Sequence, residues 1–152
     1  MGLELLLRVR REELLGKAVA ALHRAHLEHY EEAGEAQIRK RLGDLLGLVI
    51  DAVADRNLAP MSRHARIIAT ERFQAGLDLA EVQTAFNVLE EVLWFEILKA
   101  LPADGQAEAL GLVGTVLGCG KDMLARQYVS LATKTHTPSL DLQALFTGAG
   151  RF

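Results

Sequence analysis

Three histidines are the residues of this sequence whose type and spacing could hold a metal ion. His23, His26 and His29 follow one another at three-residue steps, and on a helix this spacing could bring their imidazoles close enough to share an ion. A zinc or di-iron site in a helical bundle needs further ligands, and no Glu-x-x-His or His-Glu-x-x-His pattern occurs in the chain. We therefore expect no bound metal and interpret the three histidines as boundary residues that contact the backbone or neighbouring acids.

His64 points to a different chemistry, because it lies near the apolar stripe of a predicted helix. A histidine that faces the core of a helical bundle can be an axial ligand of haem. Antiparallel pairing with the next predicted helix places His64 level with Glu90, so we prefer a contact between these two side chains at the edge of the core. Phe86 and Trp94 lie on the same helix as Glu90, and aromatic residues at helical spacing are usually core residues. A ligand pocket of His64, Phe86, Glu90 and Trp94 is the alternative, and we expect no cofactor.

The residues that nucleophilic catalysis requires are missing from recognisable positions. Cys119 lies between two glycines with Lys121 as its only basic neighbour, so we expect a buried, inert thiol. No serine occurs in a G-x-S-x-G elbow, and neither a GxGxxG fingerprint nor a phosphate-binding glycine loop is present. Because no acid and base are paired at a recognisable spacing either, we predict no catalytic residues and no enzymatic activity.

The composition favours a single all-helical domain. A chain of 152 residues can bury one hydrophobic core. Half of its residues are hydrophobic, only 5% are aromatic and three are proline, which favours helix over strand. The formal net charge is −3 with both signs interspersed, so we expect no binding to nucleic acid or to an anionic membrane. Without a signal peptide, a possible internal disulfide or an uncharged apolar run of about 18 residues, a cytoplasmic protein is predicted.

Five helices are predicted where apolar residues recur at three- and four-residue steps. They cover about residues 3–33, 35–55, 60–75, from Asp78 to before Pro102, and 106–133. A possible bend at Gly16 would divide the first of them into two helices. We assign residues 1–134 to the helical domain. We assign residues 135–152 to a tail. It either forms an extended linker followed by a short helix at 140–146, or it is disordered.

The third and fourth predicted helices should form a tight antiparallel hairpin. Gly76 suits the position just past a helix end, and Asp78 followed by Glu81 resembles a capping box. Arg72 falls on the apolar stripe of the third helix. We expect its side chain to reach the surface along its aliphatic stem or to pair with an acid such as Glu81.

Glycines on one side of the last long helix need an explanation, because each costs roughly 1 kcal/mol relative to alanine unless something packs closely there. The second predicted helix carries a matching sector of small residues. We predict that the two helices approach closely at these glycines, and the alternative is a backbone that lines a ligand slot. The positions are Gly43 and Gly47 in the second helix and Gly111, Gly114 and Gly118 in the fifth.

Residues 67–86, IIATERFQAGLDLAEVQTAF, combine Glu-Arg, a glycine, a short apolar turn and Glu-Val ahead of an apolar helix. This pattern resembles the N-terminal domain of RsbR-type regulators, the RsbT co-antagonists of the bacterial stressosome, and related input domains of histidine kinases. Tyr128 matches an aromatic residue near the end of the last helix, and the resemblance covers roughly residues 11–134. It implies a dimeric, globin-like helical bundle of five to six helices that lacks haem and signals to an output domain. Since no STAS or kinase domain occurs before Phe152, we expect a fragment or a stand-alone regulator.

Two functions are compatible with these observations. The first is a non-catalytic sensory module that couples a stimulus to a regulatory protein partner or output domain. It would form a homodimer through the leucine-rich residues 3–9 and part of the 106–133 helix, because residues 3–9 carry apolar side chains on more than one side. The second is a globin-like carrier or sensor that binds haem or another hydrophobic ligand in the helical core. A Soret band in the purified protein would favour the second function.

Overall fold

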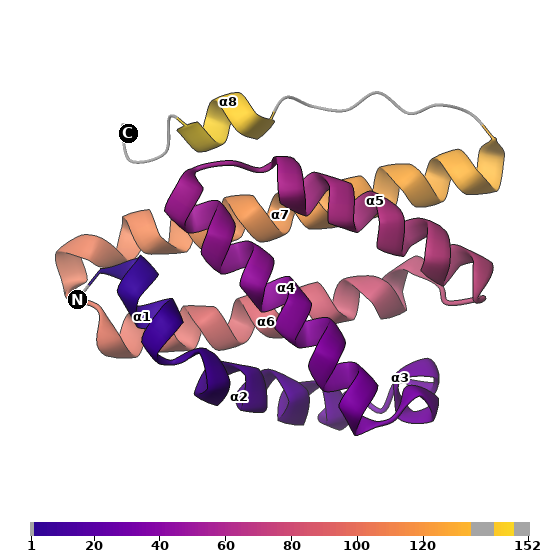
Figure 1. Cartoon of the computed structure of the whole chain (residues 1–152), viewed down its shortest axis with the longest axis horizontal. Helices are drawn as coiled ribbons and strands as arrows, with labels where there is room; N and C mark the ends of the chain where they lie inside the picture. Colours follow the sequence, from indigo (N-terminus) through magenta and orange to yellow (C-terminus); the bar gives the residue numbers. More distant parts are fainter. Residues whose placement is uncertain (1, 135–141, 148–152) are drawn as a thin grey trace.

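The computed structural model describes residues 2–134 and 142–147 of the chain (Figure 1). These residues contain helices and no strand, which confirms the predicted all-α helical bundle. The helices are α1 (Leu3–Val9), α2 (Arg11–Arg24), α3 (Glu28–Ala33), α4 (Glu35–Asp55), α5 (Ala59–Gln74), α6 (Leu79–Ala100), α7 (Ala103–Thr133) and α8 (Leu142–Thr147). Their number exceeds the predicted five to six because the first predicted helix is divided.

The prediction of one helix over residues 3–33, or of two with a bend at Gly16, is wrong, because the segment forms α1, α2 and α3. The backbone leaves helical geometry at Arg10, with φ −96° and ψ 9°, and again at His26, which has a left-handed φ of 51°. Gly16, where the bend was predicted, lies inside α2. The apolar stripes of the segments are out of phase along the sequence, so breaking the helix axis turns each stripe toward the same core.

The core lies around α4, which contacts α1, α2, α3, α5, α6 and α7. In Figure 1, α4 crosses the bundle diagonally, and the long α7 packs against both α5 and α6. The fully buried side chains of α4 include Leu46 and Val49, and those of α7 include Val113 and Leu124. No helix in the described part of the chain is both long and apolar enough to cross a bilayer.

The turn between α5 and α6 has the predicted chemistry. Gly76 adopts the left-handed φ of 86°, and the side chain of Asp78 accepts a hydrogen bond of 2.9 Å from the backbone N–H of Glu81. The Glu81 side chain accepts in turn from the backbone N–H of Asp78, which completes the capping box. The hydroxyl of Tyr128 donates to the carbonyl of Leu77 at 3.0 Å, and so holds the turn against α7.

The hairpin is nevertheless not tight along its length. α5 and α6 diverge from the turn, and each has far more contact with α7 than with the other (Figure 1). Both helices instead pack against α7. Side chains that antiparallel pairing would place opposite one another on α5 and α6 therefore need not meet.

The glycine sectors of α4 and α7 do not approach one another, so that prediction is wrong. A Cβ added at Gly43 would contact Leu15, and one at Gly47 would lie 3.2 Å from a guanidinium nitrogen of Arg11, both residues of α2. The glycine sector of α4 therefore faces α2. Apart from the nearby backbone of α7 itself, an added Cβ would meet no atom of the described residues within 4 Å at Gly111, Gly114 or Gly118.

The close approach in α7 occurs instead at Gly120. A Cβ there would lie 2.5 Å from Cε1 of Phe86 on α6 and 3.1 Å from Sδ of Met61 on α5. All three residues are buried. Gly120 is thus the position at which the backbone of α7 admits side chains from both neighbouring helices.

The helix α8 docks onto the bundle through its side chains. Gln143 accepts a hydrogen bond of 2.8 Å from the backbone N–H of Leu58 and donates one of 3.0 Å to the carbonyl of Arg56. The ring of Phe146 is fully buried. The short helix predicted at 140–146 is therefore present as α8, and the linker predicted before it lies outside the described residues.

We expect Gly120→Ala to destabilise the fold by about 1–3 kcal/mol, because the new methyl group would force the Phe86 ring or the helix backbone to shift. Gly16→Ala is the matched control. It adds a methyl group in open space within α2 and should stabilise the fold by roughly 0.5–1 kcal/mol. Urea unfolding of both variants measures the difference, and a Gly120→Ala variant as stable as Gly16→Ala would contradict the close contact.

Candidate functional site

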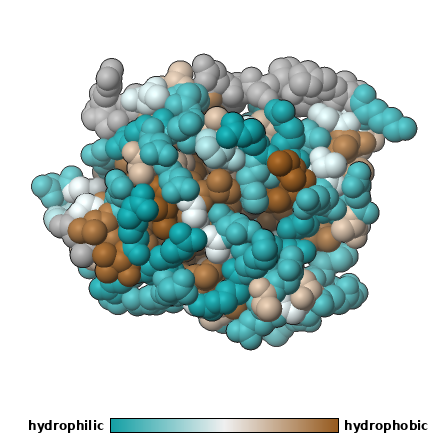
Figure 2. Space-filling model, viewed as in Figure 1, coloured by the Kyte–Doolittle hydropathy of each residue, from teal (hydrophilic) through white to brown (hydrophobic). Residues whose placement is uncertain are grey.

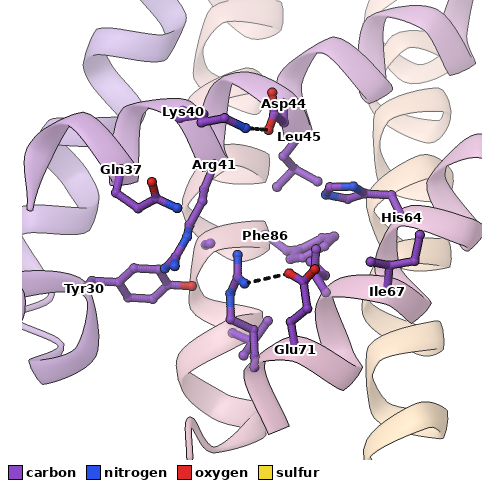
Figure 3. Close-up of a pocket in the computed structure, with 14 residues that line it drawn as sticks. Tyr30, Gln37, Lys40, Arg41, Asp44, Leu45, His64, Ile67, Glu71 and Phe86 are labelled. Carbon is purple, nitrogen blue, oxygen red and sulfur yellow. Dashed lines mark hydrogen bonds and ion pairs between the residues drawn. The ribbon is translucent and has the colours of Figure 1, made fainter. Parts of the chain in front are cut away.

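A cavity of about 230 Å³ lies between α3, α4, α5 and α6, and we call it the α3–α6 cavity (Figure 3). α4 and α5 each contribute a stripe of side chains spaced three to four residues apart, which places them on one face of each helix. Its polar lining residues are Tyr30, Gln37, Lys40, Arg41, Asp44, His64, Glu71 and Arg72. Its apolar lining residues are Leu45, Ile67, Ile68, Val82, Ala85 and Phe86.

Two arginines dominate the electrostatics of the cavity. Arg41 extends from α4 toward Tyr30, and its Nε is buried without a hydrogen-bond partner (Figure 3). The side chain of Arg72 on α5 is only 14% exposed and forms an ion pair of 3.3 Å with Glu71. Burial, and then repulsion by Arg72, lower the pKa of the Arg41 guanidinium below its usual value. The cavity therefore holds two cationic groups that repel one another.

Sequence reasoning missed Arg41, although a signal for it is present. Arg41 lies three residues after Ile38 and four before Leu45, both of which are buried in the core. A charged residue inside the apolar stripe of a helix is expected to have a partner or a function. Arg72 was noticed for that reason, and it pairs with an acid as expected, although the acid is Glu71 and not the example named, Glu81.

The predicted ligand pocket is only partly assembled. His64 and Phe86 both line the α3–α6 cavity. Glu90 instead pairs with Lys121 of α7 at 3.2 Å, so the preferred contact between His64 and Glu90 is not formed. Trp94 is 45% exposed and lies on the surface of α6. The divergence of α5 and α6 explains this result, because the side of α6 that carries Glu90 faces α7.

The residues around His64 do not fit a haem group. The cavity of about 230 Å³ is below the 300–1,000 Å³ that is typical of small-molecule pockets. Charged side chains such as Lys40, Asp44 and Glu71 line it where a porphyrin would need apolar contacts. Burial lowers the pKa of His64, so its imidazole is neutral at neutral pH.

The three spaced histidines have separate surroundings. His29 Nδ1 lies 2.7 Å from a carboxylate oxygen of Glu81, and His26 Nδ1 lies 3.0 Å from Glu31. His23 lies near the end of α2, His26 lies in the turn that follows, and His29 lies in α3. Over residues 2–134 and 142–147, no cluster of three or more metal-ligating side chains is close enough to hold an ion.

Cys119 is buried, as predicted. Its thiol is shielded by α7 and its neighbours, and this burial raises the pKa of the thiol above the usual value. Asp122 adds to the shift through its negative charge. A thiol with a raised pKa contains little thiolate at neutral pH and is a poor nucleophile.

A second feature of the molecule is a set of large apolar side chains that are exposed on α1 and α6. We call this set the α1–α6 surface, and its members are Leu5 and Val9 of α1 and Trp94, Phe95 and Leu98 of α6. The almost fully buried Glu96 pairs with Arg10 at 3.4 Å and with Lys17 at 3.7 Å, which fixes the start of α2 against α6. Figure 2 shows apolar residues gathered over α1 at the left of the molecule.

The open glycines of α7 lie beside this surface. Lys121 of α7 pairs with Glu90 of α6, and the two helices run in opposite directions. Trp94 lies one turn after Glu90 on α6, and Gly118 lies about one turn before Lys121 on α7. Trp94 and Gly118 therefore lie at the same level along the two helices. Gly114 likewise lies level with the next exposed turn of α6. The surface therefore has bulky side chains on α6 and accessible backbone on α7.

Residues 12–137 match the family model described as the RsbT co-antagonist protein rsbRD N-terminal domain. This match confirms the resemblance that was seen in residues 67–86, and it includes every helix that lines the α3–α6 cavity. No curated protein and no solved structure gives a match to the chain.

We expect His29 and His64 to titrate on opposite sides of the ordinary histidine pKa of about 6.5. The hydrogen bond to Glu81 raises the pKa of His29, and burial lowers that of His64. Imidazole proton resonances followed by NMR against pH should show His29 gaining its proton first as the pH falls. Glu81→Gln should return His29 toward 6.5 without moving His64, whereas Glu31→Gln, which removes the partner of His26, should leave both unchanged.

The same shifts give opposite dependences of stability on pH. The His29–Glu81 contact stabilises the fold below the unfolded-state pKa, and this stabilisation is lost as the pH rises through the raised pKa of His29. The half-buried, neutral His64 stabilises the fold above the unfolded-state pKa, and this stabilisation is lost as the pH falls through the lowered pKa of His64. Titration of the two imidazoles at one common pH would contradict both assignments.

Proposed function

This chain belongs to the RsbT co-antagonist protein rsbRD N-terminal domain family, and we propose that it is a sensory and regulatory module that acts through a homodimer and contacts with protein partners. The observation that carries the proposal is the α1–α6 surface, where large apolar side chains are exposed beside open glycines. We propose that a second copy of the chain docks on this surface.

The apolar character of the surface supports a protein contact. Soluble monomers seldom expose large contiguous apolar patches, and such patches mark interaction sites. The buried Leu6 and Leu7 hold α1 against the core, and so Leu5 and Val9 remain in water. Covering them gains roughly 25 cal/mol for each Å² of apolar area buried. The α1–α6 surface therefore favours association.

The shape of the surface favours a second copy over an unrelated partner. It carries a projecting residue, Trp94, and a neighbouring sector without side chains at Gly114 and Gly118. A surface with both features is complementary to itself under two-fold symmetry. The indole of one protomer would pack over the open glycines of its partner, and the reverse contact follows by symmetry. This arrangement also accounts for the helix-interior glycines at which an added Cβ would meet no neighbouring atom among the described residues.

A regulatory role agrees with the chemistry of the described residues. The buried Cys119 has a raised pKa, and the cavity holds cations without a nucleophile and base in contact. We propose that the chain works in the cytoplasm without binding nucleic acid or membrane, since a formal net charge of −3 does not attract either polyanion. Its signal would pass to a regulatory protein or an output domain.

We expect the wild-type chain to be a dimer at micromolar concentration and Trp94→Glu to be a monomer, because a carboxylate would be buried at the contact. Gly114→Leu tests the complementary half of the interface. Its side chain should fill the open sector and weaken the dimer while leaving the fold intact, since an added Cβ meets no atom within 4 Å. Multi-angle light scattering measures the mass, and circular dichroism measures the fold.

Ile67→Glu is the matched control, because Ile67 is a large exposed apolar residue on α5, outside the α1–α6 surface. This variant should remain dimeric. A wild-type chain that is strictly monomeric would remove the homodimer. If Trp94→Glu and Gly114→Leu both stay dimeric, the dimer uses a different surface.

A further inference from the structure

We propose that the α3–α6 cavity binds a small organic carboxylate, whose charged end lies between Arg41 and Arg72 and whose short apolar end lies against Phe86. The inference goes beyond the proposed homodimer and does not depend on it, because every residue of the cavity belongs to one protomer. It assigns to the signalling module the chemical class of a ligand.

The charge balance of the cavity requires one negative charge. Lys40 pairs with Asp44 at 3.0 Å, and Arg72 pairs with Glu71 at 3.3 Å, so these four groups compensate one another. No described carboxylate forms an ion pair with Arg41. A single carboxylate ligand would supply the missing charge.

The buried Nε of Arg41 makes the uncompensated charge of this guanidinium more costly. A polar group that is buried without a hydrogen-bond partner is costly, and native structures usually satisfy such groups. The guanidinium repels the neighbouring Arg72, which further disfavours this arrangement without an anion. Planar guanidinium groups bind carboxylates through paired, charge-assisted hydrogen bonds. Arg41 and Arg72 come from different helices, so a carboxylate between them would join α4 to α5.

The apolar part of the cavity lining selects the rest of the ligand. Phe86, Val82 and Leu45 are buried apolar residues that line the cavity together with its charged groups. A volume of about 230 Å³ is several times the roughly 30 Å³ of one water molecule in the liquid. The cavity therefore has room for a short hydrocarbon part, which an inorganic ion lacks.

Isothermal titration calorimetry of the full chain with sodium butyrate tests the proposal, with butyramide and sodium phosphate as the comparison ligands. We expect butyrate to bind and butyramide, which has the same shape without the charge, to bind at least about tenfold more weakly. Phosphate should also bind more weakly, because it makes no apolar contact. Sodium chloride at equal ionic strength is the reference for all three.

Two substitutions on the same helix separate the site from a general effect of charge. Arg41→Met should weaken butyrate binding by at least about tenfold and should leave the ligand-free chain at least as stable as the wild type. Arg39→Met removes an exposed arginine that pairs with Glu12 at 3.3 Å outside the cavity, and binding should be unchanged. Arg72→Met gives an independent measure from α5.

Several results would overturn the inference. Wild-type protein that binds butyrate no better than butyramide has no carboxylate site. Phosphate that binds as well as butyrate would show a general anion site without the apolar part. Equal loss of binding in Arg41→Met and Arg39→Met would show an effect of net charge alone. Calorimetry tests the ligand site and light scattering tests the dimer. The two proposals can therefore fail independently of one another.

Discussion

The rest of the structure depends on the wide apolar face of α4. Its buried residues run from Ile38 to Val53 and occupy more than one side of the helix. Such a helix must be covered by several neighbours before its apolar area is removed from water. This requirement explains the division of residues 3–33, because α1, α2 and α3 each contact α4 and an unbroken helix would follow only one line across it.

The same constraint creates the candidate ligand site. Arg41 lies between apolar residues that α4 must bury, so the helix cannot rotate this side chain into water without exposing Ile38 or Leu45. The surrounding helices supply a phenol, a neutral imidazole and a second arginine instead of a carboxylate in direct contact with Arg41. The α3–α6 cavity is therefore the space that the core side chains leave open beside the charged group of Arg41.

The helix α6 connects this cavity to the proposed dimer surface. Phe86 lines the cavity, the fully buried Leu89 and Leu93 follow it in the core, and Trp94 emerges on the surface. The Phe86 ring also lies against Gly120, so it has little room to move without displacing α7. In a closely packed interior, such a displacement is passed on to neighbouring elements. A ligand beside Phe86 and a partner over Trp94 would thus act on the same two helices.

The sequence by itself determined the fold class, the α5–α6 turn and the family. These depend on local chemistry: apolar spacing along each helix, a glycine at a left-handed φ, a capping box and a short motif at residues 67–86. Only the tertiary structure decided which side chains meet, because partners depend on how far neighbouring helices diverge and which faces they present. α7 packs against both α5 and α6, so Glu90 pairs with Lys121 and not with His64, and the close glycine contact occurs at Gly120. Arg41, an ordinary polar residue of α4 in the sequence, lacks an ion-pair partner because α5 places Arg72 near it and the nearby Glu71 pairs with Arg72.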